Sequence, residues 1–218
     1  MRKLHLRKKT IDKLPGYELR IRDRNLTIQD FLCEVNDFFE NAELPRLWPQ
    51  GNHNCYGCDL CCHEPLPVSS IDVEQICQAT GSIFSQAFKY LWVETQGNII
   101  DITLRRRRDG SCIFLRKDST CSIYQYRPFL CQTYICCQTI PEMEEVRSTI
   151  VNQGMDELVR KSLLLFNSRG LELPVNKGNK KYIKIGDWKK NKFSGKSSYS
   201  DILIKDILPS DLMRHLLL

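Results

Sequence analysis

Four cysteines fall within one short stretch, Cys55-Tyr56-Gly57-Cys58-Asp59-Leu60-Cys61-Cys62. Two-residue spacers with a glycine among them let a tight loop turn several sulfur atoms toward one centre. A cysteine that only fills space in a core needs no such spacing. Thiolates bind soft metals, chiefly zinc, copper(I) and iron in iron–sulfur clusters. The stretch therefore predicts a metal site.

A second set of cysteines follows further along the chain. The 11 cysteines are odd in number and clustered, and no secretory signal precedes them, so metal binding is favoured over a disulfide framework. We expect the fold to bring both sets together around metal, with Cys33 and Cys77 left as bystander and core thiols. The second set consists of Cys112, Cys121 and Cys131, followed by the pair Cys136-Cys137. We expect this pair to be partly buried thiols after a helix, although a redox pair or a secondary site stays open.

The spacing of the first set bears on which metal is bound. Cys55, Cys58 and Cys61 reproduce the first three ligand spacings of a bacterial ferredoxin loop. The next ferredoxin cysteine, which precedes a proline, is missing, so a [4Fe–4S] cluster would need a remote thiolate from Cys131 or Cys121. Zinc also accepts sites made only of thiolates, and both metals stay open.

Taken together, the segments that carry the first cysteine set and Cys112, Cys121 and Cys131 closely resemble the CxxCxxCC cysteine-cluster family. This family is described as zinc- or iron-chelating. Flagellin lysine methylases carry a similar cluster. The resemblance covers residues 55–134, with Tyr124, Arg127 and Pro128 matching its second block as supporting residues. Gln132 departs from the basic residue usual after the last cysteine. The metal ligands that the resemblance implies are Cys55, Cys58, Cys61, Cys62, Cys112, Cys121 and Cys131.

Several elements must position these cysteines. Apolar residues recur at helical spacing over 28–41, behind a capping box of Thr27 and Asp30. Strands are expected around 17–21 and over 99–104, and Asp109-Gly110 predicts a hairpin turn with 112–115 as the returning strand. Further helices are expected over 70–79, 82–92, from Pro128 to Cys137, from Thr139, over 155–168, and as a short piece in the apolar C-terminal tail.

These elements predict an α+β fold: a mainly helical single domain with a small β-hairpin and a metal-anchored, cysteine-rich loop. We divide the chain into a basic N-terminal segment (1–26), a metal-binding domain (27–173) and a lysine-rich C-terminal extension (174–218). No apolar run is long enough for a membrane span, and no leader is legible at the N-terminus, so a soluble, cytoplasmic protein is expected.

The formal net charge of +6 permits an acidic partner. Arg105, Arg106, Arg107 and Arg108 form a run at the expected hairpin tip, where they could bind phosphate or an acidic protein, although a solvated hairpin end explains them as well. The lysine-rich segment 175–200 has no accompanying nucleic-acid motif, and nucleic acid is not expected as a partner.

Three functions follow. The first is a metal-binding protein with an iron–sulfur cluster or zinc and a redox or iron-handling role. The second is a zinc-stapled interaction module that uses the arginine run. The third is a metal-dependent enzyme that modifies proteins, similar to the lysine methylases. No catalytic residue is assigned, although Asp59 and Glu64 lie near the metal loop and His53 and His63 flank it.

Overall fold

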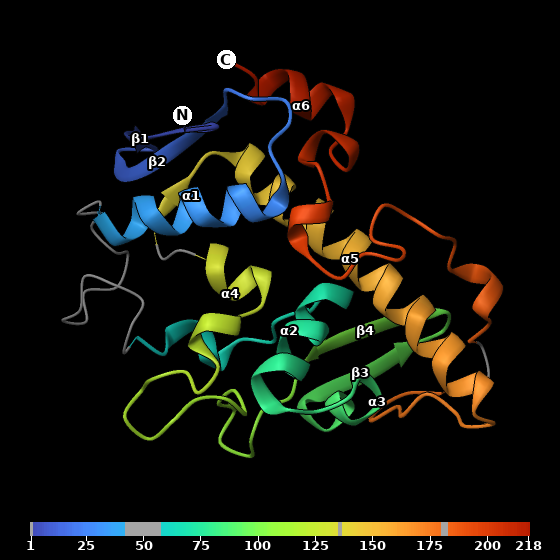
Figure 1. The fold of residues 1–218 in the computed structure, drawn as a ribbon. Coiled ribbons are helices and arrows are strands. Elements are labelled where there is room, and N and C mark those ends of the chain that lie inside the picture. Colours follow the sequence, from blue (N-terminus) through green and yellow to red (C-terminus); the bar gives the residue numbers. More distant parts are fainter. Residues whose placement is uncertain (1, 42–57, 135–136, 180–182) are drawn as a thin grey trace.

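The computed structural model describes residues 2–41, 58–134, 137–179 and 183–218 (Figure 1). It is a mixed α+β structure, as predicted. The helices are α1 (Ile28–Asn41), α2 (Ser70–Thr80), α3 (Phe84–Ala87), α4 (Phe129–Thr133), α5 (Pro141–Ser168) and α6 (Ser210–Leu216), and the strands are β1 (Leu4–Ile11), β2 (Leu14–Ile21), β3 (Leu91–Gln96), β4 (Ile99–Leu104) and β5 (Gln138–Thr139).

The basic N-terminal segment forms a hairpin. Strands β1 and β2 pair antiparallel, from Leu4 opposite Ile21 to Ile11 opposite Leu14, and β5 joins β2 in parallel. The inward side chains of β2 pack with one face of α1 and with the C-terminal residues, to form a first hydrophobic core. This core lies at the end of the molecule that carries both termini (Figure 1).

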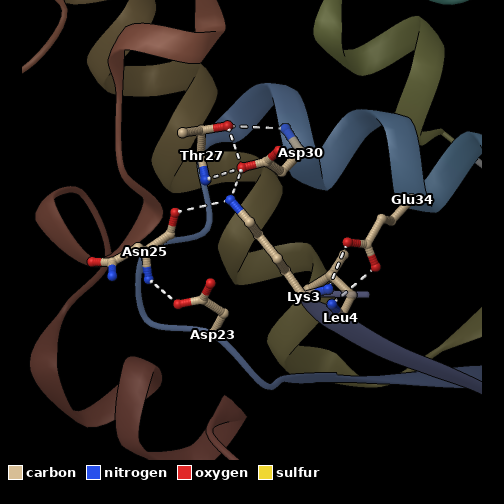
Figure 2. A network of polar contacts seen from close by, with 7 residues as sticks. All are labelled: Lys3, Leu4, Asp23, Asn25, Thr27, Asp30 and Glu34. Carbon is tan, nitrogen blue, oxygen red and sulfur yellow. Dashed lines mark hydrogen bonds and ion pairs between the residues drawn. The ribbon is translucent and has the colours of Figure 1, made fainter. Parts of the chain in front are cut away.

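A polar network fixes α1 to the hairpin (Figure 2). The predicted capping box is confirmed, because Asp30 N–H donates to Thr27 Oγ1 at 3.0 Å and Thr27 N–H donates to Asp30 Oδ2 at 3.0 Å. Lys3 Nζ also donates to Asp30 Oδ2, at 2.8 Å, and Glu34 accepts the backbone N–H groups of Lys3 and Leu4. Helix α1 is thereby anchored at its first turn and again one turn later.

Helix α5 crosses the whole structure and serves two cores (Figure 1). Its first half contributes Met143 and Ile150 to the first core, while its second half contributes Leu158 and Phe166 to a second. The second core also receives the inner faces of α2, β3 and β4. The sequence predicted two helices where this single helix runs, and Gly154 does not interrupt it.

Two other local predictions were wrong. The expected helix over 82–92 is short, because α3 and a 3-10 turn give way to β3 at Leu91. Strand β4 pairs with β3 through a turn at Gly97, so the predicted returning strand at 112–115 is not formed. Residues 105–123 instead make tight turns joined by isolated bridges between Arg106 and Cys112 and between Leu115 and Cys121.

The C-terminal residues pack into the first core. Phe193 and Tyr199 are fully buried, and the apolar tail forms α6, as the sequence predicted. Among the described helices, none combines the length and the apolar character needed to cross a lipid bilayer.

Candidate metal centre

The described cysteines of the predicted site come from three separate segments. Cys58 precedes a short 3-10 turn, Leu60–His63, which carries Cys61 and Cys62. Cys112 and Cys121 lie in the turns that follow β4, and Cys131 lies in α4. Cys55, which the sequence also assigned to the site, lies outside the described residues.

A backbone hydrogen bond joins the two cysteine sets. The backbone N–H of Cys112 donates to the Cys62 carbonyl at 2.7 Å, which ties the first set directly to the second. The side chains of Cys61 and Cys62 act on each other's pKa. Cys61 also contributes to raising the pKa of three cysteines of the second set, Cys112, Cys121 and Cys131.

The pKa of Cys61 is lowered, whereas the pKa values of the other thiols of the site with a resolved shift are raised. The hydrogen bond with Cys62 lowers the pKa of Cys61, whereas the same bond raises the pKa of Cys62. Burial raises the pKa of Cys112 and of Cys121, and raises that of Cys131 well above its usual value. The buried thiols thus favour their neutral form in the bare protein, and a bound cation would reverse this by stabilising thiolates.

One cation lies beside the thiols. The Arg127 guanidinium carbon is 3.7 Å from the centre of the Tyr124 ring. Its positive charge favours the thiolate of Cys61 and partly opposes the burial that raises the pKa of Cys121. Its Nε atom is buried and has no hydrogen-bond partner among the described residues. In the sequence, Arg127 stood out only through the family resemblance, because nothing in its spacing shows that it reaches the cysteines.

A buried carboxylate positions the helix that carries Cys131. Asp72 accepts hydrogen bonds from the backbone N–H of Ser69 and Phe129, each at 2.8 Å, and from the Tyr199 hydroxyl at 2.7 Å. The Phe129 bond fixes the first residue of α4. The sequence showed Asp72 only as a cap of α2, because its contacts with Phe129 and Tyr199 are distant along the chain.

The remaining polar candidates lie at the edge of the site. His63 is half exposed, with Nε2 at 3.9 Å from Asp59 Oδ2, and Ser119 Oγ donates to the same carboxylate oxygen at 3.1 Å. Glu64 is exposed. His53 lies outside the described residues.

The arginine run is distributed over several backbone contacts rather than gathered at a hairpin tip. Arg105 Nε donates to the Leu91 carbonyl at 3.2 Å, and Arg106 Nη1 donates to the His63 carbonyl at 3.2 Å. Arg107 Nη2 donates to a third carbonyl, that of Ile113, at 2.9 Å. Three of the four arginines therefore brace the segment that carries Cys112.

The other described cysteines are separate from this site. Cys33 is exposed on α1 and accepts a hydrogen bond from Gln29, which agrees with a bystander role. Cys77 is half-buried against the second core, and Cys137 is buried in the first. Cys33, Cys77 and the described cysteines of the candidate site are not joined in disulfides.

The donor chemistry of the site fits a thiophilic metal. All of the converging donors are thiols, which suit both zinc and iron–sulfur clusters. These thiols do not form a complete metal site by themselves. No three His, Cys, Asp or Glu side chains of the described ranges form a group that could hold a metal ion.

Residues 54–153 match the CxxCxxCC family. The family is described as a "putative zinc- or iron-chelating domain", so the resemblance seen in the sequence is confirmed. The match spans all seven predicted ligands and also the first half of α5, and its description supports metal binding, with zinc or iron as the metal. No curated protein and no solved structure shows significant similarity to the chain.

Proposed function

We propose that this CxxCxxCC protein holds an iron–sulfur cluster through its cysteines and serves a redox or iron-handling role. The observation that carries the proposal is the contact between the two cysteine sets, where the Cys112 N–H donates to the Cys62 carbonyl at 2.7 Å. Cysteines of three segments pack at the same second core, namely Cys62, Cys112, Cys121 and Cys131. The ferredoxin-like spacing of Cys55, Cys58 and Cys61 supplies the second argument, because it matches three ligands of a cluster-binding loop.

The candidate ligands divide by position. Cys55, Cys58 and Cys61 are the loop ligands, and Cys131 is our choice for the fourth, because it lies on a helix whose start is fixed by Asp72. Cys62, Cys112 and Cys121 then pack around the cluster or take part in a second site. A bound cluster would supply one-electron transfer or a store of iron.

The environment suits an anionic cluster. A cluster with four thiolate ligands is negatively charged, and a buried anion is stabilised by a nearby cation. Arg127 is such a cation: it acts on Cys61 and Cys121, and its buried Nε is without a hydrogen-bond partner among the described residues. An N–H group aimed at a cluster sulfur is a common means of tuning the cluster's potential.

The proposal is tested by anaerobic purification, with analysis of iron, zinc and acid-labile sulfide and a visible spectrum. We expect brown protein with iron and sulfide, both lost in Cys58→Ser and in Cys131→Ser. Cys33→Ser is the matched control, because it removes an exposed thiol that is not a predicted ligand and should leave colour and sulfide unchanged. Colourless protein with stoichiometric zinc and no sulfide would contradict the iron–sulfur assignment.

A zinc staple is the second candidate, and one observation favours it. The described residues of the first cysteine set and the turns over 105–123 contain little regular secondary structure, so cross-linking them through zinc would stabilise this part of the fold. Zinc that is retained on air exposure, with unfolding on its removal, would favour this function over the redox one.

A further inference from the structure

A pocket of about 580 Å³ lies beside the turns that carry Cys112 and Cys121. Arg107 comes to it from the first turn, and Arg116 and Lys117 come from the second. Phe114 and its two neighbours line it with apolar atoms, and Ser122 adds a hydroxyl group. Its volume is that of a site for a small organic molecule.

The two turns that frame the pocket are fixed by their own hydrogen bonds. Arg107 N–H donates to the Ser111 carbonyl at 2.7 Å, and Gly110 takes a positive φ of 84° to close that turn. Arg116 N–H donates to the Thr120 carbonyl at 2.8 Å in the second turn. Ser122 N–H donates to the Phe114 carbonyl at 2.8 Å, which closes the base of the second turn. The cations are therefore presented from a defined backbone.

Most of the hydrogen-bonding capacity that faces the pocket is unused. Within the part of the chain that the structure describes, the Arg116 and Lys117 side chains make no hydrogen bond or ion pair, and neither does the Ser122 hydroxyl. Arg107 spends two of its donors on the Ile113 carbonyl and the Ser111 hydroxyl, at 2.9 and 3.5 Å. Those contacts hold its guanidinium in place and leave its other N–H groups for a ligand.

Acidic residues do not cancel this charge. Of the described residues that line the pocket, only Asp109 is acidic, and its Oδ1 accepts the N–H and hydroxyl of Ser111 at 2.9 and 2.7 Å. Asp118, near Arg116, is occupied in the same way by Thr120, at 3.1 and 2.6 Å. Both carboxylates are thus committed to shaping the turns, and the pocket keeps a net positive charge.

We propose that this pocket binds a small phosphomonoester, with its phosphate held by Arg107, Arg116 and Lys117 and its apolar body against Phe114. Guanidinium groups match phosphate oxygens in pairs, and the ammonium and hydroxyl groups add donors for the remaining oxygens. The apolar wall distinguishes a phosphomonoester from inorganic phosphate, which has no body to bury. No cysteine lines the pocket, but Cys112 and Cys121 lie in the turns that frame it, so the binding test uses the metal-loaded protein.

The test is calorimetric titration of the metal-loaded, anaerobically purified protein with phenyl phosphate and, separately, inorganic phosphate at constant ionic strength. We expect saturable binding with one site per chain, and tighter binding of phenyl phosphate. Arg116→Gln and Lys117→Gln should each weaken it by about tenfold, because each removes a charge-assisted hydrogen bond. Arg108→Gln is the matched control, since it removes one exposed positive charge from the neighbouring turn without lining the pocket, and it should change the affinity by less than about twofold.

Three results would overturn the proposal. The first is the absence of saturable binding of either probe. The second is equal weakening by Arg108→Gln, which would mean that diffuse surface charge attracts the anion. The third is binding of an acidic peptide but of neither small probe, which would make this surface a protein contact. Metal content and melting temperature, measured for every variant, separate these results from misfolding or loss of the metal.

Discussion

The guanidinium group of Arg127 stacks on the Tyr124 ring, at 3.7 Å from its centre, and acts electrostatically on the thiols of Cys61 and Cys121. The ring fixes the plane of a cation whose Nε has no hydrogen-bond partner among the described residues. The sequence motif that places Tyr124 three residues before Arg127 thus has a physical reason: the aromatic residue holds the arginine toward the cysteines.

Arg127→Gln should weaken metal retention by roughly tenfold, because outer groups that stabilise metal ligands typically contribute that much to affinity. Arg127→Lys should retain metal better than Arg127→Gln but less well than the wild type, because it keeps the charge and loses the planar stacking group. Competition with a chelator of known affinity measures the effect. Arg108→Gln removes the same charge from an exposed position and should retain metal as the wild type does. Unchanged retention in Arg127→Gln would mean that the cation does not act on the bound metal.

Tyr199→Phe should lower the free energy of unfolding by about 1–3 kcal/mol. The change removes the hydroxyl that donates to Asp72 at 2.7 Å and contacts Ser69 Oγ at 2.7 Å, and so leaves a fully buried carboxylate with one bond fewer. Urea unfolding measures the loss. Tyr126→Phe removes a hydroxyl from a ring that is 40% exposed and should have little effect. Equal stability of Tyr199→Phe and the wild type would show that the C-terminal segment is not held by this bond.

Gly154→Ala should destabilise the protein by about 1–3 kcal/mol, although alanine is the better helix former. A Cβ atom at this point of α5 would collide with Ser69 Cβ and would lie 3.2 Å from Phe193 Cε1. Both neighbours are fully buried and have little freedom to move. Gly186→Ala is the matched control, because a Cβ there meets no atom within 4 Å. Thermal unfolding of the two variants compares them, and a stabilised Gly154→Ala would mean that α2 and α5 can separate at this point.

The sequence predicted those elements whose determinants lie close together in the chain. Helix α1 has its own apolar stripe and capping box, and β4 is a continuous β-branched run, so both were found with their correct bounds. Where a local signal had two possible partners, the prediction was wrong. The Asp109-Gly110 turn is real, but β4 pairs with β3, whose Leu91 and Val93 are buried in the second core.

The site shows the same division. Spacing alone marked the cysteines, since metal ligands in one loop are local features. The roles of Arg127 and Asp72 depend on contacts between distant segments, and a single sequence carries no signal for these. The long helix α5 could have been found, because Gly154 costs a helix only about 1 kcal/mol, which packing on both sides readily offsets.

Glu18→Gln should flatten the dependence of stability on acidic pH. Lys9 and Arg7 bind this carboxylate, with Lys9 Nζ at 2.6 Å, and lower its pKa below the usual value. The folded state therefore has the lower pKa, so the pair stabilises the protein fully above the unfolded-state pKa, and this contribution is lost as the pH falls through the folded-state pKa. The size is at most about 1 kcal/mol, because both cations are largely open to water.

The free energy of unfolding, measured between neutral pH and the acid transition, tests this expectation. The wild type and Glu18→Gln should converge in the acid range and differ at neutral pH. Glu40→Gln, at an exposed position in α1, should follow the wild type throughout. A constant difference at every pH would assign the effect to packing and not to charge.

Removal of the metal should loosen one part of the chain selectively. Residues 105–123 are held by turns and isolated bridges, among them the bond from Cys112 N–H to the Cys62 carbonyl at 2.7 Å. The β1–β2 hairpin belongs to the first core and shares no predicted ligand. After chelation, amide exchange at Cys112 and Ser122 should accelerate by about tenfold or more, with little change in β2, because only the first region loses the free energy of metal binding. Uniform acceleration along the chain would instead mean that the two cores unfold as one unit, and unchanged exchange at Cys112 would mean that the second cysteine set is not linked to the metal.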